Sequence, residues 1–203
     1  MDDCLKYQID PAISTVDYGI TSVMQRLQNA LLYSVGPPVT GLPWIERVYG
    51  LAKRKTDKDG KTFPIVENGQ GGYTQMQFDD RFVGTCFFYQ KDPETASDNF
   101  TGSRESSTLS LIVFADLRKI DSSRKYHFEE QLIAEVKSII INAGASLSIT
   151  NTYKEIDNVL NEFSGSARDI QNMLYPRTAF RIDMNVSYPV YCGPVTDITP
   201  LTC

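Results

Sequence analysis

A single histidine and a pair of glutamates are the first residues whose types could support chemistry. His127 is the only histidine in the 203-residue chain, so a Ser-His-Asp or Cys-His mechanism would have to pass through it. It stands beside Glu129 and Glu130 at the start of a stretch with helical periodicity, where a solvated or capping role is the commoner one. Carboxylates near a helix N-terminus are favoured by the helix dipole and need no catalytic explanation. No catalytic residue is therefore predicted here.

Asp79 and Asp80 form a second acidic pair, and their spacing argues against a shared site. Adjacent residues of an extended chain point to opposite sides, so these carboxylates would not share a proton or a divalent cation. The glycine-rich stretch 69–72 lacks both the Lys-Ser/Thr pair and the strand-to-helix context of a phosphate-binding loop, so we expect a turn. The sequence therefore predicts a protein that is not an enzyme and carries no cofactor.

The cysteines are the usual metal or disulfide candidates, and they lie far apart without a C-x-x-C pair. Zinc sites usually take ligands from close pairs, often with histidine, so no metal site is expected. An even number would permit two disulfides, but a chain of this length does not need them, and we expect reduced thiols. The pattern leaves open whether any of them pair. The four are Cys4, Cys86, Cys192 and Cys203.

Charge narrows the class of partner. The net charge is −5, whereas a duplex-DNA binder needs a concentrated basic patch. The local basic run is Lys53, Arg54 and Lys55, followed by Asp59-Gly60, a pair that suits a hairpin tip. This tip is either a solvated loop or a contact to nucleic acid or a neighbouring protein. Sequence-specific DNA binding is not expected.

The N-terminus, MDDCLKYQID, is acidic and lacks the apolar segment of a secretory signal. No apolar run reaches the roughly 20 residues that span a bilayer. We therefore expect a protein of the cytoplasm, or of an assembly built there, without membrane contact.

The element that organises the chain is residues 178–192, TAFRIDMNVSYPVYC. Apolar and polar side chains alternate in it, which predicts an antiparallel strand with one buried face. Its polar face carries Arg181 and Asp183, and we expect this face either to meet solvent or to contact a neighbouring subunit. Arg181 and Asp183 are therefore candidate assembly contacts, together with the basic run Lys53, Arg54 and Lys55.

The remaining patterns supply the elements around this strand. Apolar spacing of three and four residues predicts two main helices, over 14–35 and 127–143. Residues 81–90 and 108–117 predict strands, the second with two apolar faces and therefore central in a sheet. Further expectations are projecting hairpins over about 39–77, a loop over about 91–107, a strand over 147–150, a short helix over 153–163 and an extended tail over 193–203. The order lacks βαβ repetition and predicts a single α+β domain over 1–203, an antiparallel sheet with two main helices packed against it.

In this order of elements the chain resembles the tail-terminator and tail-completion ring proteins of tailed bacteriophages. The closest parts are the strand-then-helix run TLSLIVFADLRKIDSSRKYHFEEQLIAEVKSIIINAGA and the strand TAFRIDMNVSYPVY. The segments GLPWIERVYGLAKR and FPIVENGQGGYTQMQFDD also resemble neck-ring proteins of crAss-like phages of Bacteroides. The resemblance is topological and covers most of the chain, although the segments 44–77 and 91–107 are longer than a minimal member needs.

The resemblance implies a virion structural protein that forms a ring in the head-tail connector or neck, or that caps the tail tube. It implies six or twelve copies, with genomic DNA passing through the centre and portal, adaptor or tail-tube proteins as neighbours. Heterologous contacts that close generate rings, and polar hairpins with a polar strand face would supply two different surfaces. Two alternatives stay open. One is a portal-proximal adaptor of the same virion, and the other is a small-molecule-binding or hydrolytic α+β domain that uses His127.

Overall fold

The alternating and helical patterns give a mixed structure of strands and helices in the computed structural model. It describes residues 8–9, 19–32, 41–67, 71–91, 95–99, 102–124, 128–144, 146–165 and 175–189. In chain order the elements are β1 (Gln8–Ile9), α1 (Gly19–Leu31), β2 (Arg47–Thr56), β3 (Thr62–Glu67), β4 (Tyr73–Gln75), β5 (Gly84–Gln90), β6 (Thr95–Asn99), β7 (Gly102–Asp116), α2 (Leu117–Ile120), α3 (Glu129–Asn142), β8 (Leu147–Tyr153), α4 (Ile156–Val159) and β9 (Arg177–Pro189).

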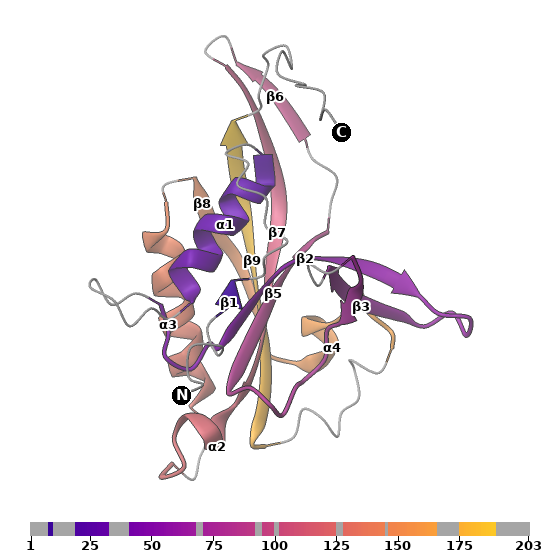
Figure 1. Cartoon of the computed structure of the whole chain (residues 1–203). Helices are drawn as coiled ribbons and strands as arrows, with labels where there is room; N and C mark the ends of the chain where they lie inside the picture. Colours follow the sequence, from indigo (N-terminus) through magenta and orange to yellow (C-terminus); the bar gives the residue numbers. More distant parts are fainter. Residues whose placement is uncertain are drawn as a thin grey trace, which may run out of the picture.

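The strands join in one sheet with the order β4-β3-β2-β5-β7-β9-β8 (Figure 1). In addition, β1 pairs with β2, and β6 pairs with β7. Most neighbouring strands are antiparallel, whereas β2 runs parallel to β5 and to β1. The helices α1 and α3 lie together on one side of the sheet, and α4 lies on the other (Figure 1). The prediction of an α+β fold with two main helices packed on a largely antiparallel sheet is confirmed.

The two faces of the sheet bury separate hydrophobic clusters, and β7 contributes to both. Leu111 and Val113 point to the face covered by α1 and α3, and Ile112 and Phe114 point to the face covered by α4. All four side chains are almost completely buried, and burial of each contributes roughly 1.5–3 kcal/mol. The predicted central position of this strand is confirmed, since β7 lies between β5 and β9.

Each main helix buries the apolar stripe that its spacing indicates. From α1 the buried side chains include Val23 and Leu27, and from α3 they include Leu132 and Val136. The first and last residues of the predicted 14–35 helix and the start of the predicted 127–143 helix lie outside the described residues, as does the 193–203 tail.

The strand predicted over 178–192 is present as β9, inside the sheet between β7 and β8, but the expectation about its polar face is wrong. Arg181 and Asp183 do not face solvent, since they are only 1% and 6% exposed, whereas Asn185 further along the same face is exposed. The alternation of residue types does not reveal the cause. The short helix α4 and the turn after it pack on this part of the face, and Val159 and Phe163 belong to the hydrophobic cluster there.

Two further predictions are corrected by strand pairing. Part of the 91–107 segment predicted as a loop forms β6 and the first residues of β7, which pair with each other and extend β7 along β9 as far as Arg104. Part of the predicted 153–163 helix belongs instead to β8, whose Tyr153 pairs with Arg181. The helix α4 has only four residues. Both segments follow tertiary pairing rather than their local composition.

The hairpins predicted over 39–77 are formed by β2, β3 and β4. Arg54 pairs with Pro64 and Thr56 with Thr62 in the antiparallel β2–β3 ladder, and β4 adds a third strand. Figure 1 shows the tip of the β2–β3 hairpin extending away from the side that carries α1 and α3. Residues 33–40 and 68–70 lie outside the described part of the chain.

Candidate functional site

The outer half of the β2–β3 hairpin carries the basic run that the sequence singles out. Lys53, Arg54 and Lys55 are all exposed, whereas Val48, Tyr49 and Ala52 nearer the start of β2 are buried. Successive strand residues point to opposite faces, so Lys53 and Lys55 share one face of the hairpin and Arg54 lies on the other. We refer to residues 53–61 as the basic tip. All three predicted contacts are therefore accessible, on the two faces of the hairpin.

The turn of the basic tip is organised by one carboxylate. Asp57 Oδ1 accepts hydrogen bonds from the backbone N–H groups of Asp59 at 2.9 Å and Lys61 at 2.8 Å. Gly60 has a φ of +77°, a conformation that side chains with a Cβ rarely adopt. The Asp-Gly signal in the sequence thus identifies a tight turn with a defined backbone conformation.

The turn end of the hairpin, where Thr62 pairs with Thr56, is fastened to the segment after α4. Thr62 N donates to Ser164 Oγ at 3.1 Å, and Ser164 N donates to Thr62 Oγ1 at 2.8 Å. The Phe63 ring lies so close to Gly165 that a Cβ at this glycine would come within 2.2 Å of it. These contacts, about 100 residues apart in sequence, fix the direction in which the hairpin leaves the sheet.

The other two predicted contacts, Arg181 and Asp183, do not join this surface. They form a buried ion pair with 2.6 Å between Arg181 Nε and Asp183 Oδ1. Their burial by the chain's own α4 turn leaves them unavailable to a neighbouring subunit, so the expected assembly contact at these positions is wrong. The role of Lys53, Arg54 and Lys55 in assembly stays a prediction.

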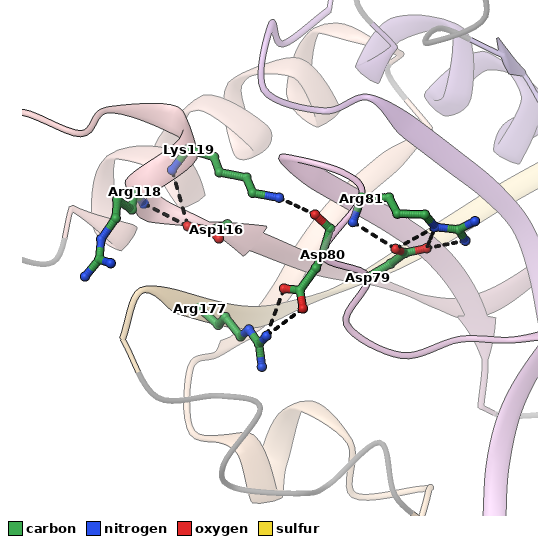
Figure 2. A network of polar contacts seen from close by, with 7 residues as sticks. All are labelled: Asp79, Asp80, Arg81, Asp116, Arg118, Lys119 and Arg177. Atoms are coloured by element: carbon green, nitrogen blue, oxygen red, sulfur yellow. Dashed lines mark hydrogen bonds and ion pairs between the residues drawn. The ribbon is translucent and has the colours of Figure 1, made fainter.

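The acidic pair Asp79 and Asp80 belongs to a network of ion pairs at one end of the central strands, where β7 ends and β5 and β9 begin (Figure 2). Arg81 Nη2 lies 2.7 Å from Asp79 Oδ2, and Arg177 Nη2 lies 2.8 Å from both carboxylate oxygens of Asp80. Lys119 Nζ donates to the backbone carbonyl of Asp80. The two carboxylates turn to different partners, as expected for adjacent residues of an extended chain.

The electrostatics of this network also favour a structural role. The hydrogen bonds that Arg81 donates hold the pKa of Asp79 below its ordinary value of 3.8, so this carboxyl stays ionised near neutral pH. Asp116 caps the short helix α2 by accepting from the N–H groups of Arg118 and Lys119. The network therefore connects the loop before β5 to α2 and to the start of β9.

The remaining chemical candidates are also accounted for by packing or lie outside the described residues. Thr178 Oγ1 donates to Glu129, and Lys154 forms an ion pair with Glu130. Cys86 is a fully buried free thiol whose pKa is raised by desolvation, as expected for a small hydrophobic strand residue. His127 lies outside the described part of the chain. Among the described residues, no three His, Cys, Asp or Glu side chains gather as metal ligands.

One feature missed by sequence reasoning is a polar pocket that includes Arg26 from α1 and Arg104 from β7. These arginines are far apart in sequence and meet only because β7 runs past α1 in the fold. The available signal was the polar face of α1, where Ser22, Gln25, Arg26 and Asn29 recur at three- and four-residue spacing.

Comparison with known proteins found no match for this chain among protein-family models or curated proteins. None of the helices in the described ranges is long and apolar enough to cross a membrane. The fold and the surface thus define an α+β protein with an exposed basic hairpin, and the function is inferred from that surface.

Proposed function

We propose that this chain is a non-enzymatic structural protein of a tailed-phage virion. It forms a ring in the head-tail connector or neck, or caps the tail tube, and genomic DNA passes through the ring without sequence-specific binding. A portal-proximal adaptor would use the same surfaces. The observation that carries the proposal is the preformed basic tip on an otherwise acidic protein, because it gives the subunit two unlike surfaces.

The charge separation is large for a chain of this size. The basic tip has five basic and two acidic side chains, a net charge of +3, which leaves −8 for the remainder of a protein whose net charge is −5. A head-to-tail contact needs two different surfaces, and repeated contacts of this kind close into rings. A basic tip that meets an acidic surface on the next subunit is such a contact, and opposite charge favours its correct orientation.

The ends of the sheet supply a second means of joining subunits. Along the path of the sheet the terminal strands are β4 and β8, and each pairs with one strand among the described residues. A terminal strand presents backbone N–H and C=O groups to which another chain can add. All three residues of β4 are exposed, and Tyr73 in this strand, 54% exposed, lies beside Lys53 with its ring centroid 5.9 Å from Lys53 Nζ. The β4 edge and the basic tip therefore form one continuous surface.

Assembly can be tested by charge removal with a matched control. The triple variant Lys53→Ala, Arg54→Ala, Lys55→Ala should lose the ring in native mass spectrometry while keeping the unfolding transition of the parent protein. The control triple variant Arg118→Ala, Lys137→Ala, Lys154→Ala has the same net charge and should still assemble.

The outcome that contradicts this assignment is equally specific. If both triple variants assemble, or if the basic-tip variant loses folding and assembly together, the basic tip is not the assembly contact. A parent protein that is strictly monomeric at all concentrations would contradict the proposed ring.

A further inference from the structure

A polar pocket lies between α1, the start of β7, the turn before β8 and the end of β9. It is at the opposite end of β7 and β9 from the ion-pair network of Asp79 and Asp80. Its volume is about 560 Å³, within the range of roughly 300–1,000 Å³ that is usual for small-molecule sites. The lining residues are Ser22, Gln25, Arg26, Asn29, Arg104, Ser146 and Ser187.

The charged side chains of this lining are all basic. It combines two guanidinium groups with three hydroxyls and two side-chain amides, and none of the lining residues is acidic. Guanidinium groups donate in a planar fork that matches a carboxylate or a phosphate group, and hydroxyls and amides can add donors around the same oxygens. The pocket therefore suits an anion that carries several oxygen atoms.

Both arginines are placed by the fold. Arg104 donates from Nε to Ser187 Oγ at 3.1 Å and from Nη2 to the Ser187 carbonyl at 3.3 Å, which orients its guanidinium along the end of β9. Arg26 lies beside Gly144, two residues after the end of α3, where an added Cβ would come 3.3 Å from Arg26 Nη1. Within the described part of the chain no acidic side chain forms an ion pair with Arg26.

We propose that this pocket binds an oxyanion, the carboxylate or phosphate group of a small molecule, between Arg26 and Arg104. Arg26 forms no ion pair within the described part of the chain, so it gains more from such a ligand than an arginine that a carboxylate already neutralises. The site is separate from the basic tip, so it stands or falls independently of the proposed ring.

The test is an NMR titration that observes the arginine Nε–Hε groups of the ¹⁵N-labelled full chain. Inorganic phosphate and citrate are added in separate experiments at constant ionic strength with chloride as the reference, since surface charges are screened by salt. Saturable shifts of Arg26 and Arg104, without a shift of Arg118, are expected for at least one probe, and the stronger binder assigns the phosphate or carboxylate class. Shifts that do not saturate, or that Arg118 shares, would overturn the proposal.

Two variants separate binding from a structural role of the same arginine. Arg26→Gln should weaken binding of the effective probe by roughly tenfold or more, since a charge-assisted hydrogen bond is lost. Asn29→Asp keeps both arginines but adds a carboxylate to the pocket wall, and it should weaken binding to a similar extent. Arg118→Gln, at a distance from the pocket, is the matched control and should bind as the parent does. Parent-like affinity in both pocket variants would contradict the assignment.

Discussion

Arg181 and Asp183 point to the same face of β9 and form a two-point ion pair, with 2.6 Å between Nε and Oδ1 and 3.1 Å between Nη2 and Oδ2. Asp183 Oδ1 also accepts from Ser110 Oγ at 2.7 Å, and these two residues are register partners on β9 and β7. Arg181 Nη1 donates to Asn161 Oδ1 at 2.8 Å in the turn after α4. The pair therefore connects the centre of the sheet to the segment that covers it.

Removal of one partner of this pair should be severe. Asp183→Asn keeps the shape of the side chain but leaves the buried Arg181 charge without a counterion, and the expected loss is about 3–5 kcal/mol of unfolding free energy. Urea unfolding measures it. The double variant Arg181→Met, Asp183→Leu removes both charges and should recover much of the loss. A loss below about 1 kcal/mol in Asp183→Asn, as for an exposed pair, would show that this ion pair is not the buried connection described above.

The substitution Met184→Asp tests the opposite face of the same strand. Met184 is 0% exposed in the cluster under α1 and α3, so a carboxylate there would be buried without a partner. Such a charge costs several kcal/mol, about the whole stability of a typical domain. We expect no cooperative unfolding transition by circular dichroism. Asn185→Asp, at the adjacent exposed position, is the control and should fold normally; a folded Met184→Asp variant would contradict the register of β9.

The ion pair of Asp79 predicts a specific dependence of stability on pH. Because the pKa of Asp79 is lowered in the folded state, its contribution is complete above the ordinary value of 3.8 and is lost as the pH falls through the lower folded value. Asp79→Asn should therefore be less stable than the parent at pH 6, and the difference should shrink in acid. Arg81→Gln removes the donor and should reproduce this pattern in thermal unfolding at both pH values. A difference that is constant between pH 6 and pH 3 would contradict it.

Cys86 should be chemically silent in the folded protein. It is fully buried, and desolvation raises its pKa, so almost no thiolate forms at pH 8. After treatment with iodoacetamide and peptide mapping, the Cys86 peptide should be unmodified in buffer and modified in denaturant. Rapid modification without denaturant would show that β5 is not the protected strand of the core.

The periodicity of apolar residues predicted the strands and helices that bury one face. The alternation around Phe180 and Met184 identified β9, and the spacing of Leu132 and Val136 identified α3. What alternation could not show is whether a polar residue faces water or a partner of its own chain. Arg181 and Asp183 are spaced like solvent-facing residues, yet they neutralise each other beneath the turn after α4.

Long-range pairing explains the other differences. The serines around Ser107 have the composition of a loop, but their backbone groups pair with β9. Of the candidate site, the basic tip was visible because Lys53, Arg54 and Lys55 are adjacent. The pocket of Arg26 and Arg104 was not visible, because α1 and the start of β7 line it together through the order of the strands rather than through any local spacing.

The proposed ring is tested most directly by cryo-electron microscopy of purified particles of the phage to which we assign this chain. We expect density for six or twelve copies arranged as a closed ring in the neck or at the end of the tail tube, with the basic tip of each subunit against its neighbour. Particles from which the chain is absent, or in which it lies outside the neck and tail, would contradict the proposed function.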